Sequence, residues 1–186
     1  MRHLLAALAL MAAGAAFADD YADVGALLRA GQSAQALARA EQYLAGKPRD
    51  PQMRFLKGVA LASAGRTDEA VAAYTALTED YPELPEPYNN LAVLFAGQGQ
   101  LDKARAALES AVRVNPAYAV AYENLGDIHV RLAEQSWTRA QQLDGQLAFS
   151  IRPKLAAARQ LIDAGKPAAR APAVVPASPA AAASKP

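Results

Sequence analysis

The side chains best placed to do chemistry are Glu123, Asp127 and Arg131, which are spaced four residues apart. On an α-helix this spacing puts all three on one face, each one turn from the next. Two neighbouring carboxylates could act as a general acid and base or hold a cation. The same spacing lets Asp127 pair with Arg131, so we favour a solvated charged face over a cation or substrate site.

Histidine and cysteine, the other usual carriers of chemistry, are almost absent. The chain has no cysteine and two histidines, His3 and His129. A chain without cysteine has no disulfide, no thiol nucleophile and no thiolate ligand, and one internal histidine cannot make the usual closed zinc site. The sequence also lacks a phosphate loop, a dinucleotide fingerprint and a nucleophile elbow. It therefore predicts a protein that is not an enzyme, with no catalytic residues, no metal and no cofactor.

Three residue types recur along the chain with a period of 34 residues. The recurring positions are Gly31, Gly65 and Gly99; Ala36, Ala70 and Ala104; and Pro48, Pro82 and Pro116. Glycine and proline punctuate helices, and alanine lets two helices approach closely. Each copy is therefore expected to hold a helix before its glycine, a second helix through its alanine and a stop at its proline.

The repeated residues resemble the tetratricopeptide repeat (TPR), a 34-residue helix–turn–helix unit. The matching positions are Tyr88, Leu91, Ala92, Phe95, Gly99, Ala104, Leu108, Ala111 and Pro116 in the third copy; Gly58, Leu61, Gly65, Ala70, Tyr74, Leu77 and Pro82 in the second; and Tyr122, Leu125 and Gly126 in the fourth. A weaker first copy spans residues 17–50, and the resemblance covers about 17–150. It implies an all-α fold, a right-handed α-solenoid of about three and a half to four helical hairpins with a C-terminal capping helix.

The repeat phase sets the expected elements. The copies lie near 17–50, 51–84, 85–118 and 119–145; the first helices lie near 20–30, 52–64, 86–98 and 119–132, and the second helices near 33–46, 67–80 and 101–114. In the fourth copy Ala133 replaces the turn glycine, so the alternative is one long helix over Ala119–Leu143. A helix over 147–163 would then cap the stack, with a kink or a start at Pro153.

The inward side chains of these helices should form one apolar seam. It would consist of Leu61, Ala70, Tyr74, Leu77, Leu91, Phe95, Ala104, Leu108 and Ala111. His129 falls in phase with Leu61 and Phe95, so we expect it to be a packed or hydrogen-bonded helix residue and not a general base.

The family resemblance implies that the first helices line a concave groove for a protein or peptide partner. Carried over position by position, the groove would be lined by Phe55, Val59, Ala62 and Ser63; by Glu86, Asn89, Val93 and Ala96; and by Val120, Glu123, Asp127 and Arg131. Some family members grip a C-terminal carboxylate with several lysines and arginines. Here the comparable positions hold Tyr21, Gly25, Asn90, Val120 and Asn124, so such a clamp is not supported.

Residues 1–18 have the form of a signal peptide. Arg2 and His3 precede an apolar run over 4–16, and Ala16-Phe17-Ala18 fits the cleavage pattern of signal peptidase. The run is too short for the ~20 residues of a spanning helix, and no cysteine is present for a lipid anchor. We expect a mature chain that begins at Asp19, without stable membrane insertion, in the periplasm of a Gram-negative bacterium or fully secreted.

Charge and composition separate the repeats from the end of the chain. The chain has 19 lysines and arginines against 18 aspartates and glutamates, and three of its cations, Lys166, Arg170 and Lys185, lie beyond the last acid. The repeat domain, 19–165, therefore lacks the basic footprint of a nucleic-acid-binding protein. Residues 166–186 are mostly alanine and proline and are expected to be a disordered tail, either a spacer or without a role.

Two functional hypotheses follow. The first is a non-catalytic periplasmic adaptor or scaffold that binds a protein or peptide of the cell envelope in its groove, in envelope assembly. The alternative is a self-associating structural protein whose groove is filled by its own C-terminal segment or by a second copy, since an open apolar groove would be an exposed patch. Catalysis by Glu123 and Asp127 ranks below both.

Overall fold

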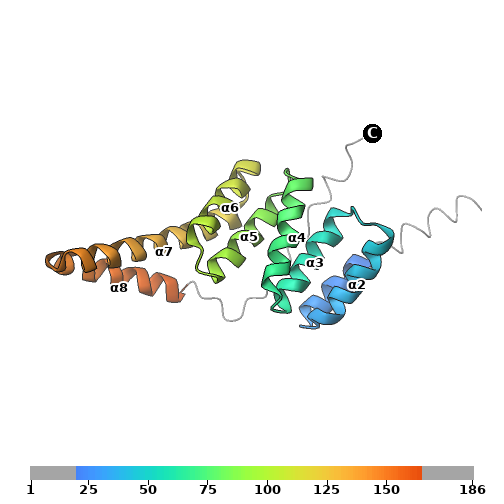
Figure 1. Cartoon of the computed structure of the whole chain (residues 1–186), viewed down its shortest axis with the longest axis horizontal. Helices are drawn as coiled ribbons and strands as arrows, with labels where there is room; N and C mark the ends of the chain where they lie inside the picture. The colour runs from blue at the N-terminus through green and yellow to red at the C-terminus, as the bar shows by residue number, and fades with distance from the viewer. Residues whose placement is uncertain (1–19, 165–186) are drawn as a thin grey trace, which may run out of the picture. The chain divides into compact units, whose positions relative to one another are not determined.

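The computed structural model of the chain describes residues 20–164, which fold into helices joined by short turns (Figure 1). A helix over residues 20–29 comes first. It is followed by α2 (Ser33–Gly46), α3 (Pro51–Ser63), α4 (Thr67–Asp80), α5 (Pro85–Gly97), α6 (Leu101–Val114), α7 (Ala119–Leu143), the 3₁₀ turn η1 (Gly145–Leu147) and α8 (Ala148–Ala164). The predicted signal peptide, 1–18, and the predicted tail, 166–186, lie outside the described residues.

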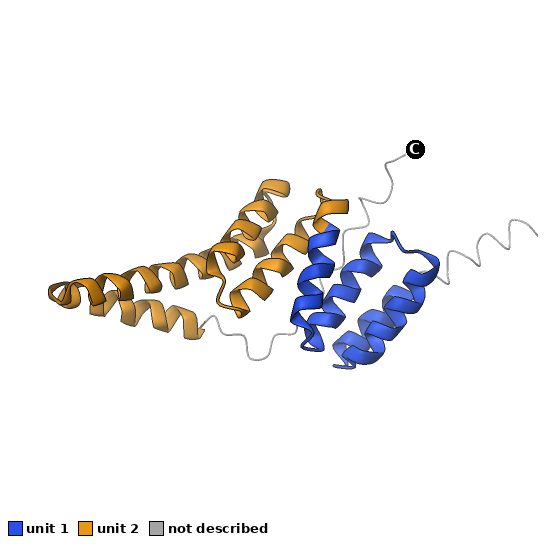
Figure 2. Cartoon of the chain, viewed as in Figure 1, with its two compact units in different colours: residues 1–77, 171–186 blue, residues 78–170 orange. Residues whose placement is uncertain are grey.

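The helices group into two compact units, which divide within α4 between Leu77 and Thr78 (Figure 2). The first unit holds the helix over 20–29, α2, α3 and most of α4, and the second holds α5 to α8. The sequence predicted one repeat domain over 19–165. Among residues 20–164, no helix is both long enough and apolar enough to cross a bilayer.

The three glycines of the 34-residue period make the same turn. Gly31, Gly65 and Gly99 have φ angles of 73°, 74° and 73°, a left-handed conformation that glycine adopts without steric cost. After each glycine, a backbone amide donates to the carbonyl five residues earlier, from Gln32, Arg66 and Gln100, at 2.9 Å in each case. This is the Schellman closure of a helix end. The repeat predicted from spacing is therefore confirmed at its turns.

The first helices of the second and third copies begin with proline. Pro51 and Pro85 occupy the first turn of α3 and α5, where the missing amide costs no hydrogen bond. Asp50 caps α3, because its Oδ1 accepts from the Met53 amide at 2.8 Å.

The alanines of the period let helices pack closely within the first unit. Ala36 and Ala70 are fully buried. Gly58 serves the same purpose on α3, since a Cβ at this position would lie 2.6 Å from Cε1 of Tyr74. The Phe55 ring lies 5.6 Å from the Tyr74 ring, centroid to centroid. Gly58 on α3 thus makes room for the Tyr74 ring of α4.

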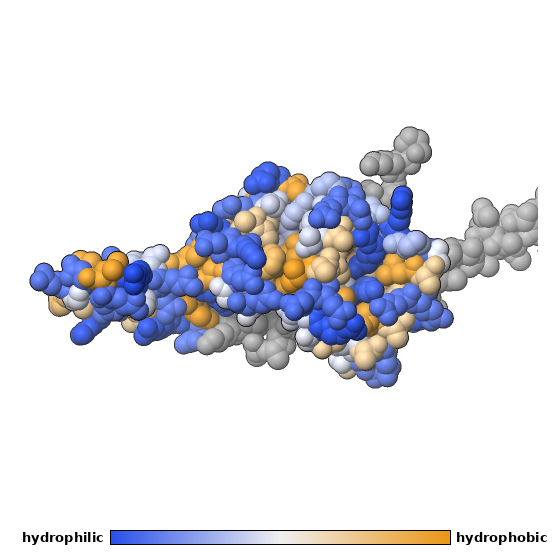
Figure 3. Space-filling model, in the orientation of Figure 1, coloured by the Kyte–Doolittle hydropathy of each residue, from blue (hydrophilic) through white to orange (hydrophobic). Residues whose placement is uncertain are grey.

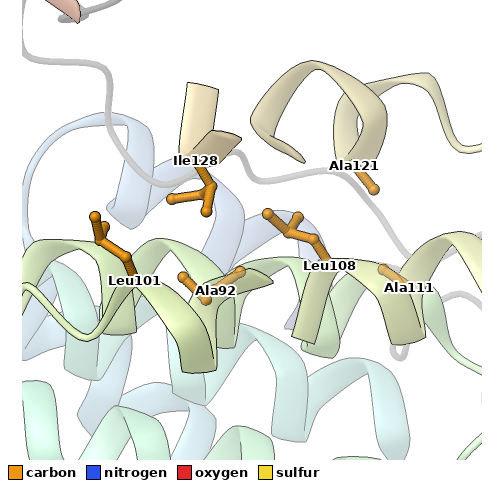
Figure 4. Close-up of a cluster of buried hydrophobic side chains, with 7 residues drawn as sticks. Ala92, Leu101, Leu108, Ala111, Ala121 and Ile128 are labelled. Atoms are coloured by element: carbon orange, nitrogen blue, oxygen red, sulfur yellow. The ribbon is translucent and has the colours of Figure 1, made fainter. Parts of the chain in front are cut away.

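The core of the second unit forms where α6 packs between α5 and α7 (Figure 4). Ala104, Leu108 and Ala111 of α6 are fully buried, as the repeat phase predicted. They meet Ala92 of α5 and residues of α7 that include Ile128. In Figure 3 the surface on the side in view mixes hydrophobic patches with hydrophilic residues.

The fourth copy does not turn where the others do. Helix α7 continues for 25 residues, from Ala119 to Leu143, which confirms the long-helix alternative. Helix α8 then folds back on α7 and buries Ile151, Leu155 and Ala158. Pro153 lies inside α8 and not at its start.

Two side chains expected in the apolar seam are more exposed than predicted. His129 is exposed, and Phe95 is half-buried with the Lys103 ammonium 5.6 Å from its ring centre. In a complete repeat the second helix would fold back over position 129. Because α7 runs straight on, no such helix covers His129, and the expectation that it is packed was wrong.

Candidate partner-binding site

Helices α5 and α7 run in the same direction and are joined by a pair of asparagines. The Asn124 amide donates from Nδ2 to Oδ1 of Asn89 at 2.7 Å. Asn89 is 2% exposed and donates in turn to Oδ1 of Asn90 at 3.4 Å. Asn89 was predicted to contact a partner, but its side chain is committed to holding the two helices in register. Its role in this structure is positioning.

A second link joins the starts of the same helices. Glu86 lies near Tyr118, the residue that precedes α7. Burial raises the pKa of Tyr118 to about 12, and the Glu86 carboxylate acts in the same direction. Oε2 of Glu86 is buried and has no hydrogen-bond partner among the described residues.

The outer side of these two helices, named here the α5–α7 face, combines one exposed apolar side chain, Val93, with the half-buried Val120 and with carboxylates. It consists of Glu86, Val93, Val120, Glu123, Asn124 and Asp127. Val93 is 50% exposed. Glu123 and Asp127 are exposed, and Glu86 is half-buried. The face can therefore offer one apolar contact and negative charge.

Arg131 lies one turn further along α7 and is half-buried. The predicted ion pair between Asp127 and Arg131 is absent from residues 20–164. Asp127 and Arg131 instead line a hollow of about 10 Å³ with Val130, Leu161 and Ile162. Such a space is about the size of one water molecule, so it does not hold a ligand.

The predicted site residues of the first unit differ in their exposure to solvent. Phe55 and Val59 are 3% and 1% exposed, and Phe55 packs on Tyr74 as part of the core. These two side chains support the fold and do not line a surface. Ser63, at the end of α3, is exposed.

Sequence reasoning missed the side chains that tie neighbouring copies together. Asn124 donates to Asn89, although from the sequence it was considered only as a position of the carboxylate clamp. In the first unit the Tyr21 hydroxyl donates to Oδ2 of Asp50 at 2.5 Å, and burial together with this bond raises the pKa of Tyr21. The available signal was position: Asp50 directly precedes Pro51 at a helix start, and Asn90 and Asn124 are one period apart.

The geometry contains nothing that would hold a metal ion within the described range. No group of three histidine, cysteine, aspartate or glutamate side chains converges among residues 20–164.

Comparison with known proteins agrees with this architecture. A tetratricopeptide-repeat family model matches residues 21–85, and a TPR-repeat model matches residues 95–132. The two matches together span more than half of the chain. The chain is a tetratricopeptide-repeat protein. Its repeats belong to a protein-interaction fold, in which stacked helix pairs create extended binding surfaces.

Solved structures of other TPR proteins resemble this TPR protein. YrrB, described as a TPR protein with an unusual peptide-binding site, is 27% identical, with a TM-score of 0.53 over 56% of this chain and 54% of its own. The match thus spans about half of YrrB. TTC0263, a thermophilic TPR protein from Thermus thermophilus, is 23% identical, with a TM-score of 0.58 over 77% of this chain and 81% of its own.

A third structure shares the fold at lower identity. The Yersinia enterocolitica type III secretion chaperone SycD, solved with a peptide of the translocator YopD, is 15% identical, with a TM-score of 0.57 over 62% of this chain and 94% of its own. No curated protein matches this TPR protein in sequence.

Proposed function

We propose that this TPR protein is a non-catalytic adaptor that binds an extended segment of a partner protein on its α5–α7 face. The carrying observation is Val93, half-exposed on helix α5, which the hydrogen bond between Asn89 and Asn124 joins to the carboxylate-bearing helix α7. An apolar side chain exposed on two helices that are fixed relative to each other can serve as an anchor for a partner. The likeness to YrrB, whose description includes a peptide-binding site, supports this proposal.

The expected affinity is modest. One apolar anchor with flanking charges on a short face corresponds to a dissociation constant of about 1 μM, or about 8 kcal/mol. Charge adds mainly to the rate of encounter and to the choice of partner, so binding should weaken as salt is raised.

Substitution of Val93 tests the face directly. A photo-crosslinking amino acid at position 93 should capture a discrete protein partner in cells. Because Val93→Asp occupies that position, its effect is read from a crosslinking probe placed at Val120. The substitution should abolish capture of the partner and leave the helical content of the protein unchanged. Phe55→Asp is unsuitable for this purpose, because it would bury a charge against Tyr74.

Leu143→Asp is the matched control. Leu143 is 72% exposed at the end of α7, outside the α5–α7 face, so the same change there should leave capture intact. Equal capture by the wild type and by Val93→Asp would reject the face as the binding site.

We also propose that the adaptor acts outside the inner membrane, in cell-envelope assembly. The motivating pattern is the signal-like segment over 1–18, which ends at Ala16-Phe17-Ala18. Expression in a Gram-negative host should yield a chain that begins at Asp19 and is released with the periplasmic fraction. An uncleaved chain found only inside the cell would contradict this location.

A further inference from the structure

Helix α8 runs antiparallel to α7 along a defined stripe. Three contacts establish its direction: Lys154 lies over the Trp137 ring at 5.9 Å, Arg159 donates to Glu134 at 3.1 Å, and Leu161 with Ile162 lies beside Asp127 and Arg131. Later residues of α8 thus meet earlier residues of α7. At Ala164, its last residue, α8 has reached the level of Asp127.

The stripe that α8 follows leads onto the α5–α7 face. Asp127, Arg131 and Glu134 are three or four residues apart, so they lie on one side of α7. The same side continues toward the start of the helix through Glu123, Asn124 and Val120. A chain that continues in the direction of α8 is therefore aimed over this face.

The sequence after α8 complements the face in charge. Residues 165–176 read GKPAARAPAVVP, with two cations, Lys166 and Arg170, and no acid. The face carries three carboxylates, Glu86, Glu123 and Asp127, and the buried Oε2 of Glu86 lacks a hydrogen-bond partner among the described residues. The remaining residues are mainly alanine, proline and valine, which suit an extended segment laid on Val93.

The distances permit both cations to reach the carboxylates. Lys166 is two residues beyond Ala164, and an extended chain covers roughly 7 Å in that interval. Arg170 is six residues beyond it, or roughly 20 Å. From Asp127 back to the start of α7 at Ala119 the helix measures roughly 12 Å.

We propose that residues 165–176 bind the α5–α7 face of their own chain and compete there with the partner. The inference rests on the proposed function, because it assigns a regulator to the same face. A tethered segment meets its site at an effective concentration of about 1 mM, so a dissociation constant of about 0.1 mM, from the ion pairs together with the contact on Val93, leaves about nine-tenths of the sites occupied. A partner then binds only by displacing the segment.

The contact itself is tested by paramagnetic broadening. The natural chain has no cysteine, so Ala169→Cys gives a single attachment site for a spin label. In the chain from Asp19 to Pro186, the label should broaden the amide signals of residues 120–127 and 89–93. Lys166→Glu with Arg170→Glu should remove the broadening, and Lys185→Glu, the distal tail cation, should not. Absence of broadening in the parent chain overturns the proposal.

A mixing experiment separates contact within one chain from contact between chains. Labelled chain at natural isotope abundance is combined with ¹⁵N-enriched chain that carries no label. The enriched signals should stay sharp. Broadening in the mixture as strong as within the labelled chain would mean that the segment docks on a second copy, which overturns the proposal.

Competition is measured with a synthetic peptide of residues 165–176 added in trans. The chain with Lys166→Glu and Arg170→Glu should bind this peptide about tenfold more tightly than the parent chain, because its own segment no longer competes. Equal affinities would overturn the competition. Partner capture at position 93 is a separate result. Broadening without partner capture would reject the adaptor function and leave the contact within the chain standing. Partner capture without broadening would reject only that contact.

Discussion

The asparagine pair between α5 and α7 gives the clearest energetic prediction at the scale of a single residue. Asn124→Ala would leave Oδ1 of Asn89, which is 2% exposed, without its donor. A buried acceptor without a partner costs about 1–3 kcal/mol, so the free energy of unfolding should fall by about that amount. Urea unfolding followed by circular dichroism measures the change.

The control for this substitution lies on the same helix. Gln135 is exposed on α7, and Gln135→Ala should change the free energy of unfolding by less than about 0.5 kcal/mol. Equal stabilities for Asn124→Ala and Gln135→Ala would show that the amide link does not stabilise the second unit.

Two glycines form a matched pair with opposite expected effects. A Cβ at Gly58 meets the Tyr74 ring at 2.6 Å, whereas a Cβ at Gly126, inside α7, has nothing within 4 Å. Gly58→Ala should therefore destabilise the chain by about 1–3 kcal/mol through overpacking. Gly126→Ala should stabilise it by about 0.5–1 kcal/mol by removing backbone freedom from the unfolded state. Thermal unfolding of the two variants decides the signs, and a stabilising Gly58→Ala would refute the close contact.

Tyr118 makes stability depend on pH in the alkaline range. Its folded-state pKa, raised to about 12 by burial and then by Glu86, exceeds the ordinary value of 10. The unfolded chain therefore loses this proton first, so the contribution is complete below about pH 10 and is lost as pH rises toward 12. In urea unfolding at several pH values, Tyr118→Phe should lose less stability than the parent between pH 10 and 12. Identical slopes would contradict the assignment.

At the scale of elements, Pro153 lowers the stability of helix α8. It lies in the sixth position of the helix, where another residue would donate its backbone amide to the Phe149 carbonyl. Proline has no amide hydrogen, so this hydrogen bond is missing. Pro153 is exposed and makes no described core contact, so Pro153→Ala should raise the free energy of unfolding by about 1–3 kcal/mol. Arg152→Ala, also exposed and adjacent, is the control and should be nearly neutral. A destabilised Pro153→Ala would mean that the proline shapes the junction with η1.

Helix positions could be predicted from the sequence because the repeat fixes them locally. A glycine able to adopt positive φ ends a helix, and a proline favours a helix start. Each affects only the few residues around it, so the spacing of these residues locates turns and helices directly. The long α7 was foreseen on the same basis, since Ala133 cannot replace the turn glycine cheaply. The extent of α8 was close to its expected range as well, because its apolar residues recur at helical spacing.

At the scale of the whole molecule, exposure was harder to predict than helix position. A position in the repeat is buried or exposed according to what the neighbouring copy brings. Asn89 is buried because Asn124 comes from the next copy, and His129 is exposed because no second helix of its own copy returns over it. Phe55 was placed in the groove by analogy and packs on Tyr74 instead. A single sequence does not contain these long-range pairings.

The uninterrupted course of α7 also limits how this array can grow. A tandem duplication of residues 85–118 would add a complete hairpin, with its own turn at Gly99 and an α6-like helix to receive the next one. A duplication that starts at Ala119 would instead add a second long helix like α7, without a turn. Helix α8 already packs on the side of α7 where a further hairpin would have to pack. A duplication therefore extends the stack of hairpins in register when it ends before residue 119.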